Sequence, residues 1–268
     1  MKSTITAVIA AIAMAHAAPQ AAAPIGAPQY TEAMLLNSAD YNAAIAPNTI
    51  VALFGQNLSF NTAALETYEI QNSTLPTSLP LTGVHVYVGG IMANIFYVSP
   101  GQINFLIPVE IPAGPTTFQV VRDGYAGPQL PLTLSALAPA FYMLDSERVV
   151  ARLADGSVDR TNNAAHPGDT ISLYATGLGQ TVPPLYNGEV TSSAQPIVNA
   201  SQLQILLDGA AVPSANIIYA GTIPTYCGLY EIDLKLPSDV GPDPQIQMTL
   251  SGQSSPKNVR LIVLPPND

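Results

Sequence analysis

The residues best suited to bind a metal ion lie in one short stretch. Asp155 and Asp159 are separated by a glycine, a serine and a valine, and Asn162 and Asn163 follow closely. Such oxygen donors suit Ca²⁺, but their spacing does not follow the D-x-[DN]-x-[DN]-G loop of calcium proteins. An Asp-Gly step is a strong signal for a hairpin turn. We therefore favour a turn over a calcium site.

Histidine and nucleophile patterns predict no catalytic site. His85 alternates with valines and is expected to face solvent, and His166 precedes a Pro-Gly turn. Neither has a Cys or His at zinc-ligand spacing. The sequence contains no G-x-S-x-G, G-x-G-x-x-G or P-loop pattern. A glycosidase-type acid pair stays open, because its carboxylates can come from distant parts of a chain; Asp239 and Asp243, around a Gly-Pro step, are interpreted as turn residues. We predict no catalytic residue, no metal site and no cofactor.

Tyrosines are the best specific sign of a ligand. The chain has 12 Tyr and no Trp, and an aromatic ring offers the apolar surface on which a sugar ring stacks. Tyr87 and Tyr125 are expected to be exposed, whereas Tyr97, Tyr174 and Tyr219 fall in apolar blocks and are expected in the core. A carbohydrate-binding module is therefore the leading alternative to a protein-binding role.

Composition excludes two classes of partner. Of the 268 residues, 48% are hydrophobic and 10% are charged, with a formal net charge of −10. An acidic chain without a basic stripe cannot displace counterions from phosphates. We expect no nucleic acid, no anionic membrane surface and no membrane insertion.

The N-terminus resembles a secretory leader. Lys2 precedes an apolar run from Ile5 to Ala15, which is too short to span a bilayer, and small residues then surround His16. We predict a signal peptide over residues 1–17, cleavage after Ala17, and an Ala/Pro-rich tether over residues 18–28. The mature protein is expected to be secreted.

The chain has a single cysteine, Cys227, so it forms no internal disulfide. A reactive or intermolecular thiol is one interpretation. Its position beside Tyr226 and before an apolar alternation favours a buried, inert thiol.

The chain contains a tandem repeat. Four blocks recur in the same order, and the first match, "APNTIVALFGQNL" with "HPGDTISLYATGL", has no gap. Such ordered recurrence indicates a duplicated structural unit. The paired blocks are residues 46–58 with 166–178, 84–90 with 203–209, 95–98 with 217–220, and 102–108 with 231–237.

The pattern of each block predicts a β-strand. Val84, Val86 and Val88 alternate with His85 and Tyr87, which is the period of a half-buried strand. Short strands separated by Gly and Pro steps are typical of all-β sandwiches.

Two local predictions concern neighbouring segments. We expect strands Gln102–Ile107 and Thr116–Val121 to form a hairpin within one sheet, with the prolines ending ladders and protecting edges. The one window with a helical period is Thr31–Asn37.

The landmarks "LNSADYNAAIAPNTIVALFGQNL", "VSPGQINFLIP", "LADGSVDRTNNAAHPGDTISLYATGLG" and "GLYEIDLKLPSDV" resemble, in this order, a family of uncharacterised domains. That family is usually found at the C-terminus of secreted acidobacterial proteins, and its halves are similar to IPT/TIG-type immunoglobulin-like modules. The resemblance covers roughly residues 36–265. It implies two immunoglobulin-like sandwiches in an extracellular setting, and it brings no catalytic residues.

We therefore predict an all-β chain of two tandem immunoglobulin-like (E-set/IPT-TIG-type) β-sandwiches, over residues 29–138 and 139–268. The segment Val149–Asp159 is expected to be a hairpin that leads into a long strand. The function we expect is non-enzymatic: a structural, adhesion or protein-interaction role at the cell surface or in the extracellular matrix, with an extracellular protein or polysaccharide as partner. An extracellular hydrolase is the less favoured alternative.

Residues 61–80 and 180–200 are the longest segments between blocks. They occupy equivalent places in the two copies, so we expect matching loops, one of which contacts the partner. Replacing residues 61–80 by a short Gly/Ser linker is then expected to abolish partner binding and to leave thermal stability nearly intact.

Overall fold

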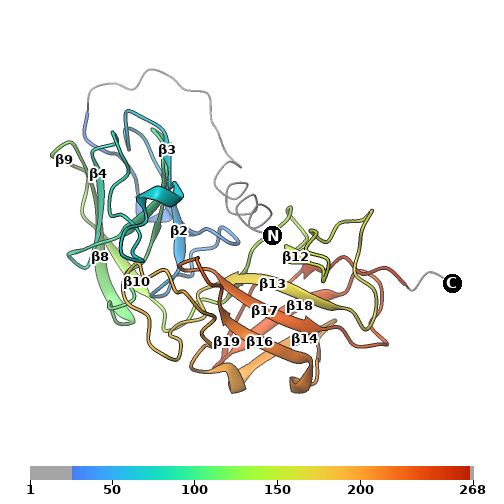
Figure 1. Cartoon of the computed structure of the whole chain (residues 1–268). Coiled ribbons are helices and arrows are strands. Elements are labelled where there is room, and N and C mark those ends of the chain that lie inside the picture. The colour runs from blue at the N-terminus through green and yellow to red at the C-terminus, as the bar shows by residue number, and fades with distance from the viewer. Residues whose placement is uncertain (1–25, 266–268) are drawn as a thin grey trace.

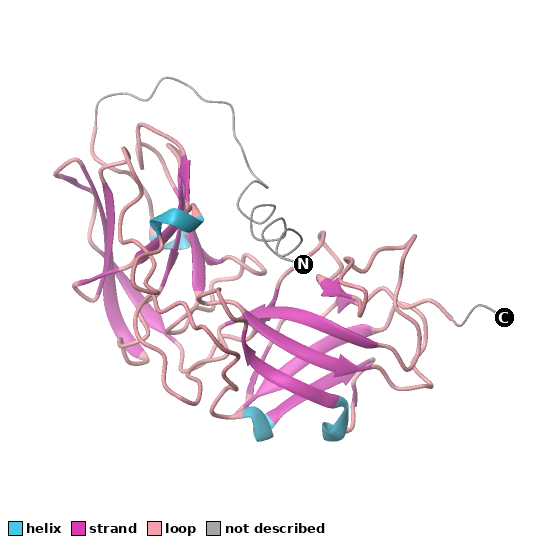
Figure 2. Cartoon of the chain, viewed as in Figure 1, coloured by secondary structure: helices cyan, strands magenta, loops and turns pink. Residues whose placement is uncertain are grey.

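The computed structural model describes residues 26–265, so the predicted leader and most of the tether lie outside the described residues. Figure 1 shows two lobes, and each is built of strands around its own apolar core. Within residues 26–265 the helical segments are short 3-10 turns (Figure 2), which are Glu32–Met34, Thr67–Glu69, Ala200–Gln202 and Ser214–Asn216. None of the helices in this part of the chain is long and apolar enough to cross a membrane.

The first lobe is a β-sandwich of two five-stranded sheets. The first sheet has the order β1 (Leu35–Asn37), β2 (Ile50–Phe54), β7 (Gln102–Leu106), β6 (Asn94–Val98) and β3 (Ala63–Ala64). The second has the order β10 (Leu130–Leu134), β8 (Gly114–Arg122), β4 (Val84–Val88) and β5 (Ile91–Met92), with β9 (Tyr125–Ala126) beside β8. We call this lobe the first sandwich.

The second lobe, the second sandwich, also has two five-stranded sheets. One contains β11 (Ala140–Phe141), β13 (Thr170–Thr176), β17 (Tyr230–Lys235) and β16 (Ile217–Thr222), with β12 (Ala151–Arg152) beside β13. The other contains β15 (Ala210–Ala211), β14 (Leu203–Leu207), β18 (Gln245–Leu250) and β19 (Gln253–Ser254), with β20 (Val259–Arg260) beside β18. The predicted boundary between residues 138 and 139 falls between β10 and β11.

The two sandwiches repeat each other down to strand register. Leu53 pairs with Ile103 in the first, and the aligned Leu173 pairs with Ile232 in the second. Both sheets are also irregular at the same place, where one extra residue is inserted before Tyr97 and before Tyr219. A bulge bends a strand and reorients the side chains beyond it. The structure thus confirms two tandem immunoglobulin-like sandwiches.

The valine alternation of β4 is confirmed. Val84, Val86 and Val88 are buried and contact the core of the first sandwich, while His85 and Tyr87 on the other face are half-buried. The hairpin predicted over Val149–Asp159 is confirmed as well, since the N–H of Leu153 donates to the carbonyl of Ser157 at 2.9 Å.

Apolar contacts join the two sandwiches. Ile50, Leu75 and Leu106 of the first sandwich form a buried cluster with Cys227 of the second. This contact covers Leu106 on the outer face of β7, a strand in which all five residues are buried. A second cluster combines Ala39 with buried residues of the second sandwich, namely Ala140, Tyr142, Val150, Tyr174, Ile223 and Leu229. We call these contacts the inter-sandwich interface.

The two longest loops contact each other at this interface. The N–H of Leu75 donates to the carbonyl of Gly188 at 2.9 Å, and the N–H of Val190 donates to the carbonyl of Ser73 at 2.8 Å. Leu75 and Leu79 of the first loop are buried. The expectation that residues 61–80 can be replaced without loss of stability is therefore wrong, because this loop fills both a core and the interface.

Two further expectations are wrong. The strands expected as a hairpin, β7 and β8, belong to different sheets of the first sandwich, so the connection between them crosses from one sheet to the other. The helical window Thr31–Asn37 contains a three-residue 3-10 turn followed by β1, because Leu35–Asn37 pairs with β2.

Candidate functional site

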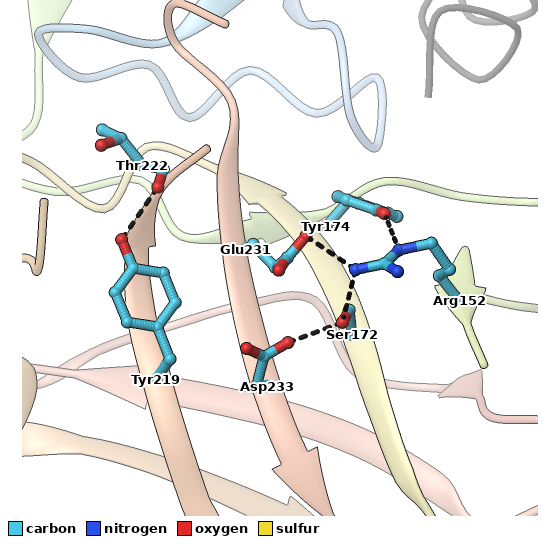
Figure 3. A network of polar contacts seen from close by, with 7 residues as sticks. All are labelled: Arg152, Ser172, Tyr174, Tyr219, Thr222, Glu231 and Asp233. Carbon is cyan, nitrogen blue, oxygen red and sulfur yellow. Dashed lines mark hydrogen bonds and ion pairs between the residues drawn. The ribbon is translucent and has the colours of Figure 1, made fainter. Parts of the chain in front are cut away.

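A row of polar side chains crosses the β13 sheet of the second sandwich. Arg152 pairs with Ser172, Ser172 with Asp233, and Asp233 with Tyr219, so the four residues occupy one register line across β12, β13, β17 and β16. Their neighbours Ile171, Leu173, Ile232 and Leu234 are in the core. Because side chains alternate along a strand, the row lies on the outer face of the sheet. We call the four residues of this line, together with the paired Tyr174 and Glu231 on the same face, the polar row (Figure 3).

Three side chains hold the guanidinium group of Arg152 in place. Its Nε donates to the Tyr174 hydroxyl at 2.8 Å, and its Nη2 donates to Ser172 Oγ at 3.1 Å. The same Nη2 lies 3.5 Å from Glu231 Oε2 in an ion pair. Ser172 Oγ in turn donates to Asp233 Oδ1 at 2.6 Å. Figure 3 shows the guanidinium group beside β13, which carries Ser172 and Tyr174, with Glu231 approaching it from β17.

Burial and the neighbouring charges of Arg152, Glu231 and Asp233 shift the pKa values of Glu231 and Arg152. Burial raises the pKa of Glu231, and the adjacent Asp233 raises it further, while Arg152 lowers it. For Arg152, burial lowers the pKa but the bonds to Tyr174 and Glu231 outweigh it, so its pKa is raised and the guanidinium stays charged. Tyr219 is tied separately, because its hydroxyl donates to the carbonyl of Thr222 at 2.8 Å.

The first sandwich carries an uncharged version of this face. Gln102 and Asn104 occupy the positions of Glu231 and Asp233, and the Gln102 amide donates to Asn104 Oδ1 at 2.8 Å. Ala52 stands where the second copy has Ser172. The ion pair of the second sandwich is therefore a specific feature of one copy and not a requirement of the fold.

The polar row suits binding through charge-assisted hydrogen bonds. Arg152 and the two carboxylates next to it are fixed by strands, so few side-chain rotations are lost when a ligand binds. Among residues 26–265, no group of three or more His, Cys, Asp or Glu side chains is placed to hold a metal ion. The structure does bring two carboxylates, Glu231 and Asp233, onto one face of one strand.

Two hollows lie on outer sheet faces away from the polar row, one over β4 and β8 of the first sandwich and one over β14 and β18 of the second. The first hollow, of about 220 Å³, is bordered by Tyr87, Gly90, Thr117, Gln119 and Gln129. The second, of about 240 Å³, is bordered by Leu206, Asp208, Gly209, Gln245, Ile246, Gln247, Lys257 and Asn258. Neither borders the polar row.

The calcium alternative does not match the arrangement of Asp155. Its Oδ1 accepts bonds from the N–H and the hydroxyl of Ser157, at 2.9 and 2.6 Å, and Gly156 has a φ of +88°. Asp159 is buried and accepts from the N–H of Ala165 at 3.1 Å. The preferred interpretation as a turn is confirmed.

The predictions of burial for the tyrosines and for the thiol are confirmed only in part. Tyr125 is 57% exposed as expected, whereas Tyr87, also expected to be exposed, is half-buried. Tyr174 is buried as expected, although at the interface. Tyr97 and Tyr219 are only half-buried, because the bulge before each one turns its side chain to the outer face. Cys227 is buried as predicted, and burial raises the pKa of its thiol to about 12.

His85 differs from its prediction, since it is half-buried and its Nδ1 is enclosed without a hydrogen-bond partner. His166 lies in a turn in which its N–H donates to Asp169 Oδ2 at 2.8 Å.

Sequence reasoning missed Arg152. A signal was present, because Ser172 and Tyr174 alternate with apolar residues on one strand and Glu231 and Asp233 do so on the next. Only the pairing of β12 with β13 shows that the arginine completes this face.

Comparisons with known proteins identify no family for this chain. No protein-family model and no curated protein matches the chain. The SGBP-B protein of the Bacteroides ovatus mixed-linkage glucan utilization locus, solved with a mixed-linkage heptasaccharide, is 13% identical with a TM-score of 0.34, over 92% of this chain and 49% of that one. The surface glycan-binding protein PbSGBP-B of Prevotella bryantii is 13% identical, with a TM-score of 0.27, over 80% and 36%.

The full extracellular region of plexin A4 is 12% identical with a TM-score of 0.27, over 88% of this chain and 18% of that one. The chain thus spans less than half the length of each of these three structures.

Proposed function

We propose that the chain is a secreted, non-enzymatic binding module with a structural, adhesion or protein-interaction role outside the cell. The observation that carries this proposal is the polar row, in which Arg152 is held by Tyr174, Ser172 and Glu231 on an outer sheet face. Polar side chains that are fixed before binding lose little entropy when a partner docks. The leader-like N-terminus and the resemblance to domains of secreted acidobacterial proteins support the extracellular setting.

The inter-sandwich interface supports the same role. Two apolar clusters and cross-sandwich hydrogen bonds join the lobes, so the outer faces of both are presented by one unit. A rigid pair of sandwiches suits a binding surface better than two lobes on a flexible linker, because its faces keep a fixed spacing.

A double substitution tests the proposal. Glu231→Gln with Asp233→Asn introduces the amides that the first sandwich already carries at Gln102 and Asn104, so the fold is expected to tolerate them. We expect at least a tenfold loss of affinity for the protein or polysaccharide that the mature chain captures from surface and matrix extracts, since Arg152 loses its ion pair.

The matched control is Glu147→Gln with Asp239→Asn. It removes the same charge from two exposed residues outside the polar row, and binding is expected to change less than twofold. Equal losses in the two double variants, or no loss in the first, would overturn the assignment of this face.

Carbohydrate binding is the second candidate function. The observation that favours it is the first hollow, where a tyrosine ring borders hydroxyl and amide groups.

A further inference from the structure

The two hollows are equivalent sites of the internal repeat. Tyr87 pairs with Gln119 across β4 and β8, and the aligned Leu206 pairs with Gln247 across β14 and β18. Gly90 and Gly209 follow in the turns after β4 and β14, both with a φ of +81°. The same place on the outer face of each sandwich is therefore hollowed by the same turn and strand pair.

The chemistry of the two hollows differs. The first is bordered by a tyrosine, a threonine, two glutamines and a glycine, and by no charged residue. In the second, Leu206 replaces the ring, and Asp208 and Lys257 add charges. The first hollow is therefore a neutral site in a chain whose formal net charge is −10.

The polar groups of the first hollow are held in place. The Gln119 amide donates to the carbonyl of Gly127 at 2.9 Å, and the Gln129 amide donates to the Thr117 hydroxyl at 3.3 Å. Because Tyr87 lies directly opposite Gln119 in register, the ring and the amide are neighbours on one face. Gly90 leaves the rim open, since a Cβ at that position would meet no atom within 4 Å.

We propose that the first hollow binds a single sugar ring of a neutral polysaccharide. The phenol ring offers an apolar surface to the C–H face of the sugar, and the hydroxyl and amides both donate and accept bonds with sugar hydroxyls. An acidic polysaccharide does not fit, because no cation borders the hollow and the chain repels it. This inference deepens the extracellular binding role and rests on it.

The size of the hollow sets the mode of binding. About 220 Å³ is less than the roughly 300–1,000 Å³ of pockets that enclose a whole ligand, so the hollow holds one ring of a longer chain. Such a site binds weakly by itself, and several copies of the protein on one polymer gain affinity through avidity. We therefore expect retention on an insoluble polysaccharide to exceed binding of a soluble monosaccharide.

The test measures retention of the full mature chain by affinity electrophoresis in gels that contain a neutral β-glucan, xylan or mannan, with polygalacturonate as the acidic probe. We expect at least one neutral polymer to retard the protein and polygalacturonate to leave it unretarded. Tyr87→Ala should reduce retardation at least tenfold. Tyr125→Ala, which removes an exposed ring outside the hollow, should change it less than twofold.

A gain-of-function variant keeps the test decisive if Tyr87→Ala proves unstable. Leu206→Tyr places the ring in the second hollow and should increase retardation by the same polymer, while Gln119→Ala should reduce it. Retardation by none of the neutral polymers, retardation that is insensitive to Tyr87 and Gln119, or binding of a protein through Tyr87 would each overturn the inference. If only the Glu231/Asp233 variant loses its captured partner and no glycan binds, the sugar site fails and the proposed function stands.

Discussion

Asn48 of the first sandwich donates a hydrogen bond to the hydroxyl of Tyr230 in the second, 2.7 Å away, and both residues are buried. Asn48 occupies a turn position with a φ of +61°, where the aligned residue of the second copy is Gly168 at +88°. The duplicated turn thus needs a residue that tolerates positive φ, and in the first copy an asparagine also supplies a donor to the interface.

We predict that Asn48 and Tyr230 are energetically coupled. Tyr230→Phe should lower the free energy of unfolding by about 1–3 kcal/mol, because Asn48 and the carbonyl of Gly179 both lose a partner in a buried site. Asn48→Gly retains the backbone conformation and removes the donor. A double-mutant cycle in denaturant should give a coupling of about 1 kcal/mol, and strictly additive losses would contradict it.

Gly228 is predicted to set the distance between the sandwiches. A Cβ at Gly228 would lie 2.5 Å from Leu106 Cδ1 and 2.7 Å from Ile50 Cγ1, both in the first sandwich. Gly228→Ala should therefore add an overpacking loss of about 1–3 kcal/mol to the cost of a positive φ. Gly209→Ala is the matched control, since Gly209 also has a positive φ but an open surrounding. Equal losses in chemical denaturation would exclude the role of Gly228 at the interface.

We predict that the buried carboxyl of Asp159 makes the stability of the protein depend on pH. Its pKa is raised from 3.8 to about 7, mainly because the carboxyl is buried; the bond from Ala165 lowers the pKa and Asp243 raises it. The folded protein therefore holds a proton that the unfolded chain releases above pH 3.8. The stabilisation from this group is full at lower pH, decreases as the pH rises toward about 7, and is constant above that.

Asp159→Asn keeps an acceptor for the N–H of Ala165 and removes the titration. Unfolding free energies measured between pH 4 and 8 should then lose the part of their pH dependence that Asp159 contributes. An unchanged pH profile in the variant would show that folding does not raise the pKa of Asp159.

Cys227 is predicted to report on opening of the interface. Its burial raises the pKa of the thiol to about 12, so the nucleophilic thiolate is scarce and enclosed at pH 8. A disulfide reagent should label the native protein only as fast as the interface opens, and Gly228→Ala should accelerate labelling. Immediate labelling of the native protein would mean that the thiol is accessible.

The repeat made much of the fold predictable. Aligned blocks with apolar residues at every second position predicted that Leu53 and Leu173, and Ile103 and Ile232, occupy equivalent core positions, and the registers agree. This succeeded because a two-residue period leaves one way to bury each strand.

The failures come from contacts between distant segments. Nothing in the local pattern indicated that Ile50 and Leu106, on the outer face of their sheet, would be covered by the second sandwich. The bulges misled the placement of Tyr97 and Tyr219, since one inserted residue reverses the faces beyond it. The polar row escaped prediction because Arg152 reaches it through a two-residue strand.

The two ends of the described chain are anchored on different sandwiches. Arg122 donates to the carbonyl of Gly26 at 2.6 Å in the first, and the N–H of Leu264 donates to the carbonyl of Ala165 at 2.9 Å in the second. Tension applied between these ends would therefore pass from one sandwich to the other, across the inter-sandwich interface. We expect the contacts between the lobes to break under such a force while both β-sandwiches stay folded.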